Sequence, residues 1–334
     1  MNMYLILSCL FLVTALPGCD PPDTTGEGAD SYTAVNLLSA SRSGEIDRVV
    51  SSYLKGYSYI SVGLIGPDGT LLVRSYGSDR IGKTDVYASV SKPVTATIFF
   101  SMLENGEIHS VDDPIGLYSD KYKDVMPADY GNLNLTFKHL LSHQSGIPHH
   151  DRIWDRGKLK LAFKPGTQAM YSTRGYGVLG EVLCGIAGMN YNHLVRTYIG
   201  EPVGAGSFSA PSFLFEAPGG LVRSTISDMV RFAEGVLDHT YVGSALQHDL
   251  QWVPYAQDQQ GQIGMGWYLN NVGTDSLAVY HAGSNGKPRA FIALRPDQHI
   301  GVVLLGKRSS SKGSQLFYQL AMDLIQELRT YPEQ

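Results

Sequence analysis

The sequence has few cysteines, few charged residues and no concentration of positive charge. Its 334 residues include three cysteines, Cys9, Cys19 and Cys184, and 17% are charged, with a net charge of −5. Cys9 and Cys19 lie in an N-terminal apolar run, so Cys184 would stand alone in the folded part. An intramolecular disulfide is then excluded. The absence of a basic stripe argues against nucleic acid as a partner.

The N-terminal apolar run is too short to span a membrane comfortably and predicts a signal peptide over residues 1–19. It ends in Leu16-Pro17-Gly18-Cys19, which resembles a bacterial lipobox, so we expect lipidation at Cys19. A plain signal peptide with an incidental cysteine is the alternative. Residues 20–34 read as a flexible polar tether. Together these features predict an exported cell-envelope protein, a periplasmic lipoprotein held at the membrane by its lipid.

The chain also lacks an internal repeat and a βαβ rhythm, which disfavours a parallel doubly wound sheet. Strand patterns gather instead at its two ends, so we expect an α+β fold. An antiparallel sheet would be flanked by terminal helices, with a mainly helical inserted subdomain at about 107–215 in a single domain over 35–330. The expected elements are a helix at 35–55, a hairpin at 59–77 around Pro67-Asp68-Gly69, a helix at 89–104, strands at 277–283, 288–295 and 300–306, and a helix at 313–329.

A serine and a lysine stand three residues apart at the start of the helix expected from residue 89. This spacing places Ser89 and Lys92 on one helix face, with Cβ atoms about 5–6 Å apart. A serine hydroxyl becomes a useful nucleophile when a base takes its proton. Burial and the positive end of a helix both disfavour the ammonium form of lysine. The pair therefore suits nucleophilic catalysis, although a capping serine with a solvated lysine would give the same pattern.

Four further segments, which follow in order along the chain, strengthen the catalytic interpretation of Ser89 and Lys92. After S-V-S-K come "LTFKHLLSHQSGIP" (135–148), "FKPGTQAMYSTRGYGVLGEVL" (163–183), "APGGLVRSTISDMVRFAEGVL" (217–237) and "HAGSNG" (281–286). These resemble the S-x-x-K, "HLLTHTSGLP", Y-x-N, "AGGL-S-T-x-x-D" and K-T-G or H-x-G segments of the serine β-lactamase-like superfamily. That superfamily includes class C β-lactamases, D-alanyl-D-alanine carboxypeptidases and related esterases. The resemblance covers roughly residues 45–330.

The resemblance implies a role for each matching residue. Ser89 would be the acylated nucleophile, and Lys92 and Tyr171 would share the base and proton-shuttle work. The backbone N–H groups of Ser89 and Ser284 would form the oxyanion hole. Gly283 and His281 would line the substrate side of a sheet edge. No cofactor and no metal are implied, and the partner would be a small-molecule or peptide substrate. The oligomeric state stays open.

Two positions depart from the family pattern. Thr173 stands where the tyrosine motif usually has asparagine, and its hydroxyl would be a shorter and less directional substrate contact. His281 stands where many penicillin-recognising members keep lysine, and an imidazole is a weaker partner for a carboxylate. We therefore expect a serine hydrolase acting through an acyl-enzyme on an ester or amide. A D-alanyl-D-alanine carboxypeptidase or class C β-lactamase, and a non-catalytic envelope binding module, are the alternatives.

Two rival sites are weaker. Residues 282–286 nearly match the G-x-S-x-G elbow of α/β-hydrolases, but that motif needs a helix after its serine, and a strand pattern follows Ser284. His139 and His143 have zinc-ligand spacing if they share a helix, yet no H-E-x-x-H pattern is present. We expect Cys184, within an apolar segment, to be a core residue.

Overall fold

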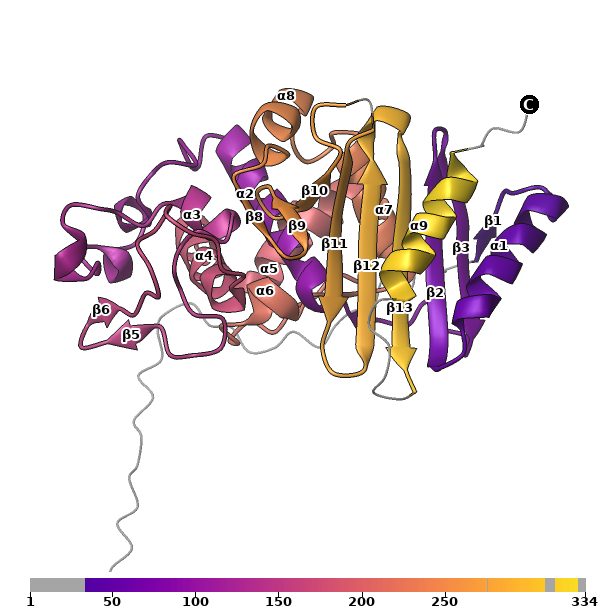
Figure 1. Cartoon of the computed structure of the whole chain (residues 1–334), viewed down its shortest axis with the longest axis horizontal. Coiled ribbons are helices and arrows are strands. Elements are labelled where there is room, and N and C mark those ends of the chain that lie inside the picture. The colour runs from indigo at the N-terminus through magenta and orange to yellow at the C-terminus, as the bar shows by residue number, and fades with distance from the viewer. Residues whose placement is uncertain (1–33, 275, 310–315, 330–334) are drawn as a thin grey trace, which may run out of the picture.

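The computed structural model describes residues 34–274, 276–309 and 316–329. Its main feature is a nine-stranded antiparallel sheet (Figure 1). The predicted signal peptide, the tether and Cys19 lie outside the described residues. In sheet order the strands are β1 (Val35–Asn36), β3 (Gly69–Gly77), β2 (Tyr57–Gly66), β13 (Ile300–Arg308), β12 (Pro288–Arg295), β11 (Ala278–Ser284), β10 (Tyr268–Asn270), β9 (Gly261–Ile263) and β8 (Ala256–Asp258).

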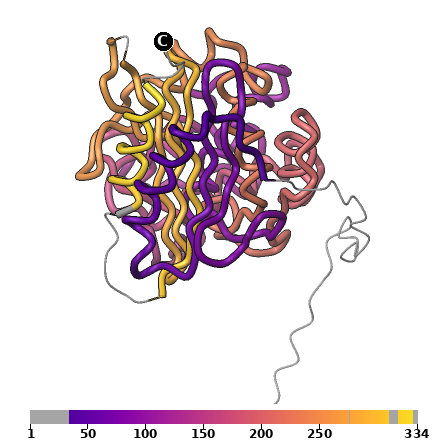
Figure 2. The backbone as a smooth tube through the Cα atoms, turned by 90° about the vertical axis from the view of Figure 1, so that its right-hand side faces the viewer, coloured from indigo at the N-terminus to yellow at the C-terminus, as the bar shows by residue number. Residues whose placement is uncertain are grey.

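The two ends of the chain meet in the middle of this sheet. β13 pairs antiparallel with β2, so that Val303 lies opposite Gly63, and the views in Figures 1 and 2 place these distant segments side by side. Most residues of β2, β12 and β13 are buried, because helices cover both faces of the sheet. Strands buried on both faces have nearly continuous apolar sequences, as these three do. The predicted α+β class and the antiparallel sheet are confirmed.

Helices α1 (Ala40–Tyr53) and α9 (Leu316–Leu328) cover one face. Their apolar side chains join those of β2, β3, β12 and β13 in one core cluster. The prediction of a helix from residue 35 was wrong at its start. Val35 and Asn36 pair with β3 as an edge strand, and the helix begins only after Ser39, whose side chain accepts a hydrogen bond from the N–H of Arg42.

The other face carries the helical part of the molecule. Helix α2 (Ser91–Glu104) is almost entirely buried there, and α7 (Ile226–Leu237) packs on β2 and β13. The remaining α-helices are α3 (Phe137–Leu141), α4 (Thr173–Ala187), α5 (Tyr191–Val195), α6 (Ala217–Gly220) and α8 (Ser244–Leu246). Two small ribbons, β4–β7 (Asp85–Val86, Arg223–Ser224) and β5–β6 (Trp154–Asp155, Lys158–Leu159), accompany them. The expected helical insertion is thus present, between the two groups of sheet strands.

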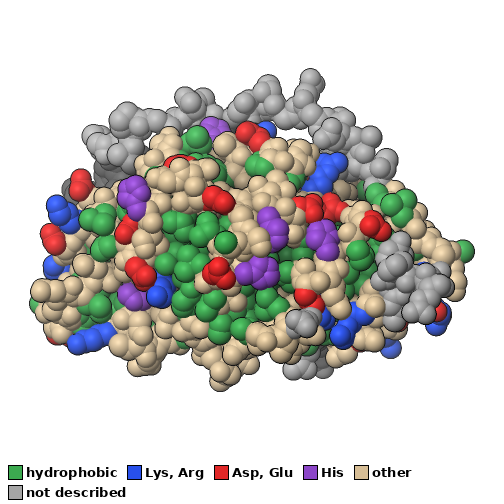
Figure 3. Space-filling view, turned by 90° about the horizontal axis from the view of Figure 1, so that it is seen from above, with side chains coloured by type: hydrophobic (Ala, Val, Ile, Leu, Met, Phe, Trp, Pro, Cys, Tyr) green, Lys and Arg blue, Asp and Glu red, His purple; other side chains and the backbone are tan. Residues whose placement is uncertain are grey.

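Besides β1 and the two small ribbons, three further strands of the main sheet were not predicted from the sequence. β8, β9 and β10 have three residues each, which is too short for an alternating pattern to stand out. Among the described residues, no helix is long and apolar enough to cross a membrane. On the face seen in Figure 3, the described lysine and arginine side chains lie scattered among hydrophobic and acidic ones.

Candidate active site

Ser89 lies in a short 3₁₀ turn, Ala88–Val90, that leads directly into α2. Ala88 has a left-handed backbone, with φ of 48°, which is unfavourable for a residue with a Cβ. Ser91 secures this turn, because its buried hydroxyl donates to the Ala88 carbonyl at 2.6 Å and accepts from the Val222 N–H at 2.9 Å. No role for Ser91 could be predicted from the sequence. The structure makes it a positioning residue for the strained turn.

Lys92 is fully buried in the first turn of α2. Its Nζ atom donates to the Gly219 carbonyl at 2.5 Å and to the Thr173 hydroxyl at 3.2 Å. It also lies 4.5 Å from the centre of the Tyr171 ring. Burial lowers the pKa of Lys92 well below its usual value, which favours the neutral amine. A neutral amine has two N–H bonds and one lone pair, so these two acceptors leave the lone pair available to take a proton.

Tyr171 stands just before α4, where Ser172 caps the helix by accepting the N–H of Gly175. Burial raises the Tyr171 pKa well above its usual value, and a side-chain hydrogen bond with Ser89 partly offsets that rise. The group is therefore a phenol at neutral pH and can both donate and accept a proton. The structure brings together Ser89, Lys92 and Tyr171, the three catalytic residues that the family resemblance implies.

The open edge of β11 forms the other wall of the site. β10 pairs only with Ala278–Tyr280, so the rest of β11 faces a cavity of about 1000 Å³ lined by Ser89, Tyr171, Gly283 and Ser284, among others. Gly283 permits a close approach here, since a Cβ on it would lie 2.4 Å from the Tyr87 carbonyl oxygen. Ser89 and Ser284, the two predicted oxyanion-hole residues, thus line one cleft.

His281 belongs to β11 itself but is not among the residues that line the cleft. It is buried, with its ring 6.3 Å from that of Tyr171 and 5.5 Å from that of Tyr268. Burial and the nearby Lys92 lower its pKa to about 3. Nδ1 lies 2.9 Å from the Ala282 carbonyl, which a neutral ring satisfies by carrying its proton on Nδ1. Nε2 is then an acceptor on the Tyr171 side of the sheet.

Two further histidines surround Tyr171, and the sequence analysis gave neither a place in the site. The rings of His143 and His149 lie 4.5 Å and 5.3 Å from that of Tyr171. Burial lowers both pKa values, that of His149 to about 4. Nδ1 of His149 accepts the N–H of Thr173 at 3.0 Å, so its neutral ring carries the proton on Nε2. His149 lines the cleft, where Nε2–H makes it a hydrogen-bond donor.

Thr173 points its hydroxyl at Lys92 and does not line the cleft. The structure therefore gives Thr173 a contact with Lys92, where the sequence pattern suggested a contact with substrate. Gly219 supports the same arrangement, because a Cβ there would lie 2.7 Å from the Thr173 carbonyl oxygen. Thr173, at the start of α4, and Gly219, in α6, therefore both accept hydrogen bonds from Lys92.

The structure lacks the features that the two rival sites, the G-x-S-x-G elbow and the His139–His143 zinc site, would require. Strand β12 follows Ser284 in an antiparallel hairpin, which excludes the strand-turn-helix of an α/β-hydrolase elbow. His139 and His143 do not share a helix, since α3 ends at Leu141 and His143 has a left-handed φ of 60°. In the part of the chain that the structure describes, no three His, Cys, Asp or Glu residues lie close enough to hold a metal ion.

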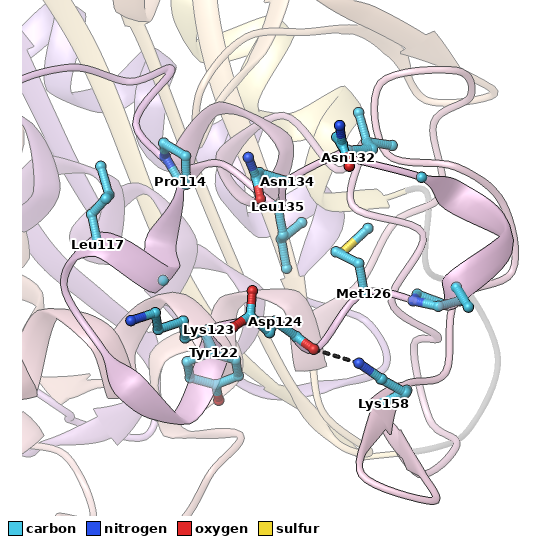
Figure 4. Close-up of a pocket in the computed structure, with 15 residues that line it drawn as sticks. Pro114, Leu117, Tyr122, Lys123, Asp124, Met126, Asn132, Asn134, Leu135 and Lys158 are labelled. Atoms are coloured by element: carbon cyan, nitrogen blue, oxygen red, sulfur yellow. Dashed lines mark hydrogen bonds between the residues drawn. The ribbon is translucent and has the colours of Figure 1, made fainter.

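A second cavity, of about 500 Å³, opens in the helical part and shares no lining residue with the cleft. Figure 4 shows its wall, where Lys158 donates to the Asp124 carbonyl at 2.6 Å beside Met126 and Leu135.

Cys184 is partly buried against the core, as expected, and burial raises its pKa to about 12, so its thiol is unreactive.

A family model described as Beta-lactamase matches residues 86–323, which include the nucleophile turn, the tyrosine motif and the β11 edge. The chain belongs to the beta-lactamase family. Membership of this family supports a serine hydrolase as the general activity. The resemblance read from the sequence is confirmed.

Relatives of this family member are distant. The D-alanyl-D-alanine-carboxypeptidase/endopeptidase AmpH of Escherichia coli (strain K12) is 23% identical, over 85% of this chain and 88% of its own length. Penicillin-binding protein 4* of Bacillus subtilis (strain 168) is also 23% identical, over 59% of this chain and 54% of its own length. A beta-lactamase/D-alanine carboxypeptidase from Yersinia pestis, solved with citrate, has a TM-score of 0.71 at 20% identity and covers 86% of this chain and 99% of its own. The structural likeness shows the shared fold.

Proposed function

We propose that this family member cleaves an ester or amide through an acyl-enzyme on Ser89. The observation that carries the proposal is the contact between the Ser89 hydroxyl and the Tyr171 phenol, with the buried Lys92 amine over the phenol ring at 4.5 Å. Ser89 attacks the carbonyl carbon of the substrate. Its proton passes through Tyr171 to the lone pair of Lys92. The face of the aromatic ring then stabilises the ammonium that forms.

The leaving group departs as its bond to the carbonyl carbon breaks, and it takes the proton back through the same relay. Water then attacks the acyl ester and regenerates Ser89. The N–H groups of Ser89 and Ser284 stabilise the oxyanion in both steps, each contributing about 3–4 kcal/mol. His149 donates its Nε2–H into the cleft, as the asparagine amide of the usual motif would do.

The neutral state of the site favours an uncharged scissile region. His281 has a pKa of about 3 and His149 one of about 4, so neither imidazole supplies a positive charge next to Ser89 at neutral pH. Burial lowers the pKa of Lys92 well below its usual value, which disfavours its ammonium form. A lysine at the position of His281 would provide such a charge for the carboxylate of a penicillin or peptide. We therefore rank esters and amides ahead of β-lactams and D-alanyl-D-alanine peptides.

A substrate panel tests this ranking. Purified protein would be assayed on p-nitrophenyl esters, D-amino acid amides, nitrocefin and D-alanyl-D-alanine peptides, with Ser89→Ala as control. We expect turnover of esters or amides that Ser89→Ala loses. Turnover of the esters that survives in Ser89→Ala would refute the proposal, and a preference for nitrocefin or the peptides would reverse the ranking. Absence of turnover, together with tight binding of a panel member, would favour a binding module.

We further propose export and lipid attachment through Cys19, on the evidence of the apolar run and the lipobox-like segment alone. Metabolic labelling with an alkyne fatty acid should mark the wild-type protein in the membrane fraction. The variant Cys19→Ser should lose the label and leave that fraction. Equal labelling of both proteins would contradict lipidation at Cys19.

A further inference from the structure

Two buried arginines lie on the face of the sheet that α9 covers, opposite the face that meets the Ser89 turn. Arg289 begins β12 and Arg308 ends β13, with 7% and 4% of their surfaces exposed. Arg289 pairs with Gly306, and Arg308 pairs with Tyr57. Paired residues share a face, and so do residues two apart in a strand. Phe317 of α9 packs on this face, since it stacks on Tyr57 with ring centroids 5.0 Å apart.

The hydrogen-bonding groups of this cluster are incompletely used. Nη1 of Arg289 donates to the carbonyls of Gly286 and Pro288 at 2.7 and 2.8 Å. Nε of Arg289, Nη2 of Arg308 and the Tyr57 hydroxyl are buried without a hydrogen-bond partner. Within the described residues, neither arginine forms an ion pair. Three unpaired donors in one place are unusual, because buried polar groups are nearly always paired.

Another arginine of the same strand shows the contrast. Arg295 is equally buried at the far end of β12, but its guanidinium pairs with Asp297 at 3.1 Å. Two neighbouring buried cations without a counter-charge repel one another and have lost their hydration. Burial and the nearby Arg308 accordingly lower the pKa of Arg289. An anion beside them would relieve both costs.

One member of the cluster, Arg289, lines the active-site cleft. Arg289 lines the same cavity of about 1000 Å³ as Ser89, and it lies directly opposite Ser284 in the β11–β12 pair. The residues that line this cavity come from both faces of the sheet, with Ser89 on one face and Phe317 on the other. Phe317 and Tyr318, in the first turn of α9, also line it.

We propose that Arg289, Arg308 and Tyr57 form a binding pocket for an oxyanion, a carboxylate or a phosphate, at the α9 end of the cleft. The unused N–H groups of the two guanidinium planes suit the oxygen atoms of such a group, and the Tyr57 hydroxyl adds a third donor. The oxyanion is either the distal acid of a substrate whose scissile bond lies at Ser89, or a free anion. The first source rests on the proposed hydrolase function, and the second does not.

Binding of inorganic phosphate tests the pocket itself. Thermal unfolding would be followed in rising phosphate, with sodium chloride at matched ionic strength as reference. We expect the Tm of the wild type and of the matched control Arg295→Gln to rise with phosphate beyond the chloride series. Arg289→Gln and Arg308→Gln should lose that rise. Tyr57→Phe, which removes one hydroxyl, should weaken it and serves if an arginine variant does not fold.

Matched substrates separate the two sources. The pairs are p-nitrophenyl butyrate with p-nitrophenyl hydrogen succinate, and the octanoate with the hydrogen suberate. A substrate-borne acid predicts a ratio of kcat/KM that favours the acid-terminated ester by about tenfold or more, lost in Arg289→Gln and kept in Arg295→Gln. A phosphate-dependent Tm without that preference assigns the pocket to a free anion. Turnover of no ester, with the Tm effect intact, would refute the hydrolase proposal and leave the pocket standing. Absence of both effects would overturn the pocket.

Discussion

At the Ser89 end of the cleft, Lys92, His149 and His281 are buried or half-buried, but each has a hydrogen-bond partner within the chain. At the Arg289 end, two buried guanidinium groups keep N–H donors that no described residue accepts. At the Ser89 end, hydrogen bonds within the chain offset the cost of burying these groups, and burial sets their protonation states before a substrate binds. At the Arg289 end, the cost of burying the two guanidinium groups is left for a ligand to offset. One cavity thus connects the proposed catalytic site at Ser89 with the proposed oxyanion pocket at Arg289.

The largest expected effect concerns Lys92. Lys92→Met keeps the apolar stem in its buried site but removes the amine, so kcat should fall by about 10²- to 10⁴-fold with little change in secondary structure. Steady-state kinetics on the best substrate of the panel would measure it. Lys164→Met is the matched control, since Lys164 also lies over a tyrosine ring, at 5.6 Å, but is exposed and does not line the cleft. An equal loss in both variants would contradict the assignment.

The contact between β11 and the nucleophile turn should be the next most sensitive. Gly283→Ala places a Cβ against the Tyr87 carbonyl and must displace the Ser89 turn or the strand. Misplacement by about 1 Å costs up to about 10²-fold in rate. Gly185→Ala, at a helix position with open space, should leave kcat unchanged and raise stability by about 0.5–1 kcal/mol. Wild-type kinetics in Gly283→Ala would mean that this wall does not position Ser89.

A pH series examines the buried histidines at the Ser89 end. His281 has a folded-state pKa of about 3 against 6.5 for an ordinary histidine, so the unfolded chain takes up the proton first as the pH falls. Its share of stability is complete above pH 6.5 and is lost towards pH 3, at about 1.4 kcal/mol per pH unit. Urea unfolding of wild type and His281→Asn should show a shallower acid slope in the variant. Parallel slopes would contradict burial of a neutral His281.

The smallest effect concerns Ser91. Ser91→Ala leaves the Val222 N–H and the Ala88 carbonyl without their hydroxyl partner, which should cost about 1–3 kcal/mol in unfolding free energy and lower kcat. Ser101→Ala, on the same helix, also removes a buried hydroxyl, one that contacts the Thr97 and Tyr241 carbonyls. We expect the control to lose stability and keep kcat. A Ser91→Ala variant that loses only stability would limit Ser91 to a structural role.

The sequence was sufficient for the architecture because long, regular patterns carry it. The hairpin at 59–77, the strands of β11–β13 and the helix after Ser89 follow from apolar runs bounded by turn residues. It failed for strands of two or three residues and for the start of α1, where pairing with β3 overrides local preference.

The site was predictable only where a motif marked it. Ser89, Lys92 and Tyr171 come from motifs, and the structure brings them together. The conformation of the segment before His149 places this residue in the site. No rule of residue spacing predicts that placement. Arg289 and Arg308 stand apart in the chain and meet through the register of β12 and β13. Whether two arginines are buried side by side depends on the tertiary structure, so this pair can be recognised only once the pairing of the strands is known.

The proposed hydrolase function depends on acylation of Ser89, and intact-protein mass spectrometry with peptide mapping detects the reactive serine. Incubation with a fluorophosphonate should add one adduct to the wild type, located on Ser89, and none to Ser89→Ala. An adduct on Ser284, or an active enzyme whose Ser89 stays unmodified, would contradict the account.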